Sequence, residues 1–262
     1  MYDNLKNIRN LSPCILASLN KLIVNRMGKT PEAFMLTRDI VSFISPNQTY
    51  RFGPDISLCT SKPSSQLVDK KLFKIPDYAV LTGIWNNHES TFNPTANILG
   101  GMGMLMLDDN QSVQIPVITA TAENLDFYHA RLLSIGDTLT FETQQNLPLT
   151  EVTVGSDYVD FYLSLTERGG GEYIEYHDEP HLWAPKHAHC GGHILLGKQV
   201  QGKFYFTGFR IPFGQAVYLS PNILHSDAYL IGDYLVVYTT TDAYSTVIFR
   251  DKAKQIKRLE FI

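Results

Sequence analysis

The stretch that decides the expected fold is Pro185-Lys-His-Ala-His-Cys-Gly-Gly-His193, which holds His187, His189 and His193 within seven residues. In an extended chain successive side chains alternate between two faces, so His187 and His189 are expected to point to the same side. A turn at the glycine pair can bring His193 back toward them. His225 follows behind a proline turn. The sequence therefore predicts one metal site with these four histidines as ligands.

Neutral imidazoles suit Fe(II), Mn(II), Ni(II), Cu(II) and Zn(II). The chain has eight histidines, and six of them lie between His177 and His225, a concentration that scattered core or surface histidines do not explain. The upstream run from His177 to His181 also contains Asp178 and Glu179. This run could supply a ligand or an acid/base group, but a polar run between strands is more typical of a solvated loop.

Composition excludes several classes of protein. The chain has 262 residues, with 22 Lys and Arg against 26 Asp and Glu, and no basic run, which argues against a nucleic-acid partner. Three cysteines are too few for a disulfide framework and favour a reducing compartment. No segment has the roughly 18 consecutive apolar residues of a membrane span. We therefore expect a cytoplasmic protein with neither nucleic-acid nor membrane partners.

The first 74 residues are predicted to be a helical lead-in followed by an irregular crossing segment. Apolar residues at three- and four-residue steps indicate a helix over residues 12–27. A second helix is expected to begin at Thr30, with Pro31 in its first turn, and to run to Ile44. From residue 78 onward the pattern changes to short β-rich runs, including 78–85, 102–107 and 187–189. The main body is thus predicted to be all-β.

The β-rich part also contains an apparent internal repeat. Residues 94–102 align without gaps with residues 185–193, and further matches follow in the same order. This alignment predicts an N-terminal barrel at 75–168 and a C-terminal barrel at 169–262. At the positions of the four histidines the first copy has apolar residues, namely Ala96, Ile98, Met102 and roughly Leu147. Only the second copy is therefore expected to bind a metal ion.

These motifs resemble the cupin superfamily, in particular the bicupins, in which two double-stranded β-helix (jelly-roll) barrels are joined in one chain. The first cupin motif is matched by His187, His189 and His193, and the second by Gly214, Pro221 and His225. His193 stands where the family usually has a glutamate, which moves the site toward all-histidine ligation. His193 is then either a ligand or a group that touches a ligand or the substrate. The resemblance also implies pairing as a homodimer.

The resemblance implies a mononuclear metal-dependent enzyme for a small polar or carboxylate-bearing metabolite. Non-haem Fe(II) oxygenation (dioxygenase chemistry) is favoured, because a neutral imidazole shell suits iron and leaves room for O2. The alternatives are a metal-dependent hydrolase or isomerase, and a cupin that binds a small molecule without catalysis. Arg210 is the candidate group for binding an anionic substrate, since a buried guanidinium in a mostly apolar strand needs a partner; an intramolecular salt bridge would satisfy it equally well. Tyr205 and Tyr218 are candidate hydroxyl contacts, and no catalytic residue is predicted.

Overall fold

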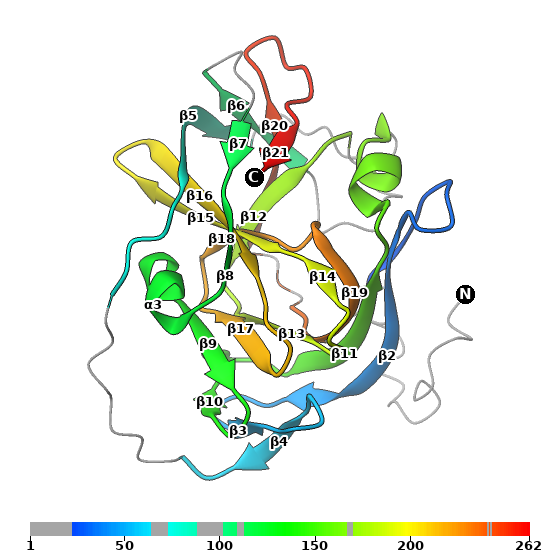
Figure 1. Ribbon diagram of the computed structural model, residues 1–262, viewed down its shortest axis with the longest axis vertical. Helices are drawn as coiled ribbons and strands as arrows, with labels where there is room; N and C mark the ends of the chain where they lie inside the picture. Colours follow the sequence, from blue (N-terminus) through cyan, green and yellow to red (C-terminus); the bar gives the residue numbers. More distant parts are fainter. Residues whose placement is uncertain are drawn as a thin grey trace.

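The computed structural model describes residues 23–63, 73–87, 102–108, 113–166, 170–239, 241 and 243–262. Strands predominate over helices in this part of the chain, and they form two large sheets with smaller sheets at the periphery (Figure 1). The prediction of an all-β class is confirmed. The helix expected over residues 12–27 lies mainly outside the described residues, and its last three residues, Asn25–Met27, form a strand.

The first large sheet combines strands from the beginning, middle and end of the chain. Its order is β1 (Asn25–Met27), β2 (Phe34–Ile44), β11 (Leu147–Val154), β19 (Leu230–Val237), β13 (His181–Pro185), β17 (Gln215–Leu219) and β9 (Ala130–Ser134). The short strand β14 (Gly191–Gly192) pairs with β19 outside this path.

The second large sheet closes on itself. Its order is β15 (Ile194–Val200), β18 (Leu224–Ser226), β12 (Tyr173–His177), β20 (Tyr244–Arg250), β6 (Met102–Leu107), β5 (Ala79–Asn86) and β16 (Lys203–Arg210), and β16 pairs back with β15. The result is a closed seven-stranded barrel. Strand β8 (Val117–Thr119) adds to it in parallel with β16.

The remaining elements are short. A three-stranded sheet contains β10 (Thr138–Thr140), β3 (Thr49–Phe52) and β4 (Leu58–Ser61), and β7 (Val113–Ile115) pairs in parallel with β21 (Leu259–Phe261). The described helical elements are α3 (Ala122–Leu125), the 3-10 helix η3 (Asp126–Tyr128) and the π-helical turn η4 (Val159–Leu163).

The helix predicted from Thr30 to Ile44 is wrong, because β2 occupies Phe34–Ile44. Its apolar residues fit helical spacing, yet the segment is rich in β-branched and aromatic residues, and it pairs with β11 along its length. The duplication is not confirmed either. Both large sheets combine strands from 75–168 with strands from 169–262, so the described residues form one closed barrel where the repeat predicts two.

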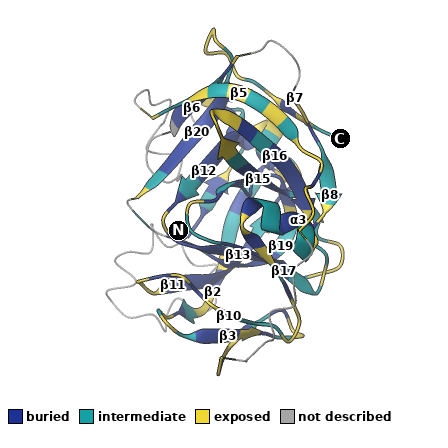
Figure 2. Cartoon of the chain, turned by 90° about the vertical axis from the view of Figure 1, so that its left-hand side faces the viewer, coloured by how far each residue is buried: buried dark blue, intermediate teal, exposed yellow. Residues whose placement is uncertain are grey.

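The central strand β13 separates two hydrophobic clusters and is buried at every position (Figure 2). Trp183 belongs to the larger cluster, whereas Leu182 and Ala184 belong to the smaller one. Because alternate residues of a strand face opposite sides, His181 lies on the same side as Trp183, toward the larger cluster. A histidine at the start of β13 is therefore directed into the interior.

Candidate metal centre

Three buried histidines converge in the interior, namely His177, His181 and His225. His177 ends β12, His181 begins β13, and His225 is the middle residue of β18. Their ring centroids are 4.6 Å (His177 to His181), 5.0 Å (His177 to His225) and 5.1 Å (His181 to His225) apart. One ligand atom from each lies within 4.8 Å of the other two, so the three side chains could hold a metal ion.

Strand register and one turn bring these residues together. Glu175 on β12 is directly opposite His225 on β18, and His177, two residues along, lies on the same face of β12 as Glu175. The three-residue turn after His177 then passes the chain from the closed barrel to β13 in the other sheet. The backbone N–H of Asn222 donates to the carbonyl oxygen of His177 (2.7 Å), which fixes the end of β12 against the turn before β18.

The hydrogen bonds of two rings leave one nitrogen available on each. Nδ1 of His181 lies 2.8 Å from the carbonyl oxygen of Val237, and Nδ1 of His225 lies 2.8 Å from that of Ile223. Because a carbonyl oxygen can only accept, each Nδ1 carries the proton and each Nε2 carries the lone pair that a metal ion needs.

The cluster also contains buried nitrogens that lack a hydrogen-bond partner. These are Nε2 of His225 and both ring nitrogens of His177, whose ring lies near the backbone of Glu179 but without the geometry of a hydrogen bond. Leaving a buried polar group unsatisfied costs about 1–3 kcal/mol. An ion coordinated by these nitrogens would offset that cost, so the residues fit a metal.

Burial keeps two of the rings neutral. The pKa of His181 is lowered to about 3 by burial and by the nearby His225. The pKa of His177 is lowered further, again chiefly by burial, with His181 and His225 adding to the effect. Both imidazoles are therefore unprotonated at neutral pH, the state in which histidine binds a metal ion.

A carboxylate lies beside this cluster. Oε1 of Glu175 is 3.8 Å from Nε2 of His225, and its Oε2 accepts a hydrogen bond from Thr246 Oγ1 (2.9 Å). Burial raises the pKa of Glu175, and the neighbouring His225 opposes the rise. Three imidazoles and one carboxylate form a donor set suited to first-row transition metals.

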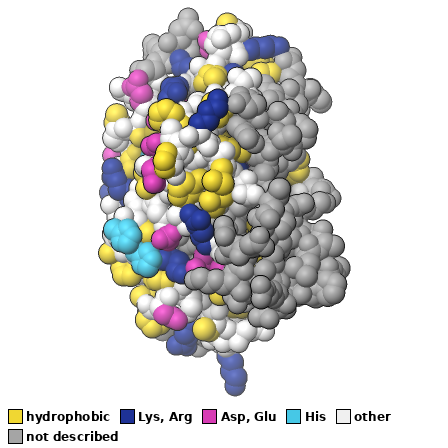
Figure 3. Space-filling view, turned by 90° about the vertical axis from the view of Figure 1, so that its right-hand side faces the viewer, with side chains coloured by type: hydrophobic (Ala, Val, Ile, Leu, Met, Phe, Trp, Pro, Cys, Tyr) yellow, Lys and Arg dark blue, Asp and Glu magenta, His cyan; other side chains and the backbone are white. Residues whose placement is uncertain are grey.

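Of the four histidines predicted as ligands, the structure places only His225 in this cluster. The strand predicted at residues 187–189 is a turn, closed by a hydrogen bond from the N–H of Cys190 to the carbonyl oxygen of His187 (3.1 Å). His187 and His189 consequently lie exposed, their rings stacked 5.1 Å apart. Figure 3 shows two adjacent histidine side chains at the surface of the molecule.

His193 lies apart from the cluster in an aromatic environment. Its ring stacks on Tyr229 at 5.2 Å and contacts Phe261 at 4.1 Å, measured between ring centroids. Burial, together with the positive charge of Arg210, lowers the pKa of His193 to about 4. The structure therefore brings together a different set of histidines from the one that the sequence predicts.

The predicted substrate-binding residues are also dispersed. The expectation that Arg210 is buried is wrong, because it is exposed at the end of β16 and donates to the carbonyl oxygen of Val117 (3.0 Å). Tyr205 packs edge-on against Tyr78. Tyr218 is fully buried in the smaller hydrophobic cluster, on the side of the sheet opposite His181.

Sequence reasoning missed His177 and His181 as ligands by treating their run as a solvated loop. The available signal was a histidine pair flanking Pro180, since proline interrupts strand pairing and so marks a boundary between two strands. Two histidines at such a boundary end one strand and begin the next.

Comparisons with known proteins identify no family for the chain. No protein-family model, curated protein or solved structure matches it. Across the described residues, no helix has the length and apolar character needed to span a membrane. The class of the protein therefore has to be argued from its fold and its histidine cluster.

Proposed function

We propose that the protein is a cupin-type, mononuclear metal-dependent enzyme that acts on a small polar or carboxylate-bearing metabolite. In this proposal His177, His181 and His225 hold one divalent transition metal ion. The observation that carries the proposal is the convergence of these three buried rings, with nitrogens of His177 and His225 that have no hydrogen-bond partner.

Fe(II) is the favoured ion and oxygenation the favoured reaction. A bound ion would act as a redox centre or Lewis acid, with positions left for substrate, water or O2. The protein contributes neutral imidazoles whose orientation is fixed by backbone carbonyl groups. Glu175 contributes a carboxyl group beside the His225 ring, held in place by the hydrogen bond from Thr246.

Metal-assisted hydrolysis or isomerisation is the nearest alternative, because the same donor set serves a Lewis acid. The Glu175 carboxyl group lies beside the site, within reach for the proton transfers that such reactions require. The metal found in the native protein bears on this choice: iron favours oxygenation, whereas zinc, which has no redox chemistry, favours the alternatives. A protein that binds a small molecule without catalysis would carry the metal and show no turnover.

The decisive experiment is elemental analysis of untagged protein purified without chelating resin. We expect about one equivalent of a transition metal at the buried site, and its loss from a folded His177→Leu variant. His129→Asn is a matched control, because His129 is an exposed histidine outside the cluster with a φ of 59°, which asparagine tolerates. A wild-type protein that binds no transition metal under anaerobic loading would refute the proposal. Oxygen uptake with a panel of small carboxylates then tests the oxygenase assignment.

A further inference from the structure

The turn that carries His187 and His189 is held firmly against β19. The N–H of Lys186 donates to the carbonyl oxygen of Asp233 (2.9 Å), and Cys190 Sγ donates to the same oxygen (3.1 Å). Gly192 has a φ of 75°, and a Cβ there would lie 2.0 Å from the carbonyl oxygen of Tyr229. Only glycine allows the chain to approach β19 this closely. The two exposed histidines therefore project from a fixed backbone.

The separation of these two rings is that of a ligand pair. Their centroids are 5.1 Å apart, but the rings are stacked with planes only 8° apart, so one ring has to turn before both can direct a nitrogen at the same ion. The buried pair His181 and His225 has the same centroid separation, 5.1 Å. Two imidazoles bound to one ion at about 2.1 Å in tetrahedral geometry have centroids about 5 Å apart.

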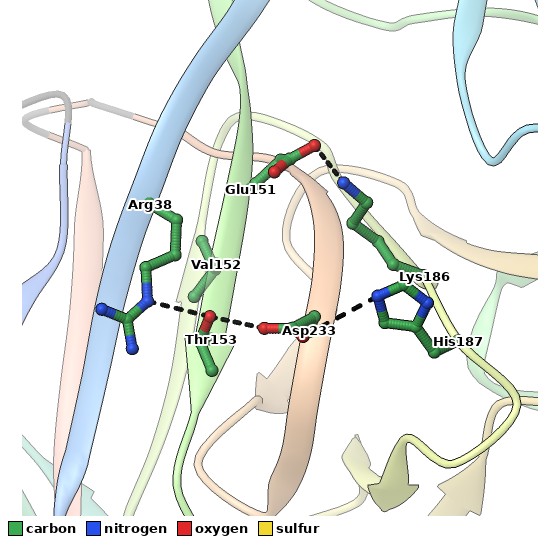
Figure 4. Close-up of a pocket in the computed structure, with 7 residues that line it drawn as sticks. All are labelled: Arg38, Glu151, Val152, Thr153, Lys186, His187 and Asp233. Carbon is green, nitrogen blue, oxygen red and sulfur yellow. Dashed lines mark hydrogen bonds and ion pairs between the residues drawn. The ribbon is translucent and has the colours of Figure 1, made fainter. Parts of the chain in front are cut away.

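Asp233 supplies a third donor beside the pair. Its Oδ2 is 3.9 Å from Nε2 of His187, while its Oδ1 accepts a hydrogen bond from Thr153 Oγ1 (2.6 Å). Thr153 in turn accepts from Nε of Arg38 (3.0 Å). Figure 4 shows this chain of contacts, with the carboxylate between Thr153 and His187. The hydrogen bond from Thr153 thus orients the Asp233 carboxylate so that its other oxygen faces His187.

We propose that His187, His189 and Asp233 form a second metal site, at the surface, for a divalent transition ion such as Zn(II), Ni(II) or Cu(II). The histidine-rich turn then has a role of its own, separate from the buried cluster. The ring of His189 must rotate to bring a nitrogen to the ion, which an exposed side chain does at low cost. The site borders a pocket of about 420 Å³ that Arg38, Glu151 and Lys186 also line, so the ion stays open to solvent or to a small anion.

The test is equilibrium dialysis of untagged, metal-stripped full-length protein against Zn(II) buffered at about 1 μM. We expect two equivalents for the wild type and one for a His187→Ala, His189→Ala double variant. The His129→Asn variant controls for binding by an unrelated exposed histidine and should keep two equivalents of zinc. Asp233→Asn preserves size and removes the charge, and it should weaken the second equivalent about tenfold.

The variants separate this site from the buried one. A His177→Leu variant should keep the zinc ion at the surface site and bind one equivalent. The triple variant, His177→Leu, His187→Ala, His189→Ala, should bind none. These two results together would support both sites. Unchanged binding in the His187→Ala, His189→Ala variant would overturn the surface site and leave the buried one intact. Full loss of zinc from that double variant would support the surface site and count against the buried one.

Discussion

His177→Leu should stabilise the metal-free protein. Both ring nitrogens of His177 are buried without a hydrogen-bond partner, and the side chain is 2% exposed. Leucine has a similar volume and no polar atom, so the replacement removes an unsatisfied polar group worth about 1–3 kcal/mol. In a chain of this size each kcal/mol shifts the Tm by roughly 2–4 °C. The expected gain is therefore roughly 2–12 °C in chelator.

With metal bound, the wild type should instead be more stable than the His177→Leu variant. A free ion at 1,000 times its Kd adds about 4.1 kcal/mol to the stability of a protein that binds it only in the folded state. The variant lacks this stabilisation because it does not bind the ion. Thermal and urea unfolding, each with chelator and with metal, measure both effects. His181→Leu is a matched control, because it also removes the hydrogen bond to the carbonyl oxygen of Val237 and should gain less. A metal-free His177→Leu protein less stable than wild type by more than about 1 kcal/mol would refute the reasoning.

Three further predictions concern Glu172, Glu175 and Gly192. The pKa of Glu172 is raised to about 7, chiefly by burial, from its usual 4.5. The fold therefore favours its protonated form, so stability is full below pH 4.5 and falls by about 3 kcal/mol as the pH rises through 7. Glu172→Gln should flatten that dependence in urea unfolding between pH 5 and 8, and an unchanged slope would contradict the assignment. Glu175→Gln should weaken metal affinity about tenfold or more in a competition assay with a chromophoric chelator, whereas equal affinity would place Glu175 outside the metal's environment. Gly192→Ala should lower the Tm more than Gly202→Ala does. Both glycines have a positive φ, which costs a residue with a side chain about 1–2 kcal/mol. An added Cβ at Gly192 also meets the carbonyl oxygen of Tyr229, whereas at Gly202 it meets nothing within 4 Å. Equal losses would mean that the turn can move away from β19.

The β class could be predicted because it depends on local patterns, as at residues 102–107, where the predicted strand is β6. The segment Phe34–Ile44 could not be predicted in the same way. Its apolar residues fit a helix as well as a strand, and its pairing with β11, more than a hundred residues later, decides the outcome. A non-local partner overrides local propensity there.

At the candidate site, too, non-local structure decided what the sequence could not predict. A His-x-His pair places two side chains on one face only if the backbone is extended, and residues 187–189 form a turn instead. His177 and His181 meet because the chain changes sheets between them, and sequence spacing alone does not encode such a crossing. His225 does lie in a histidine cluster, but with His177 and His181 and not with the three histidines predicted as its partners.

The change of sheet between His177 and His181 has a consequence for biosynthesis. His177 and His225 come from the closed barrel and His181 from the other sheet, so the ligand set is complete only after both sheets have come together. An ion bound there, as proposed, would cross-link the two sheets and could be taken up only after they have come together.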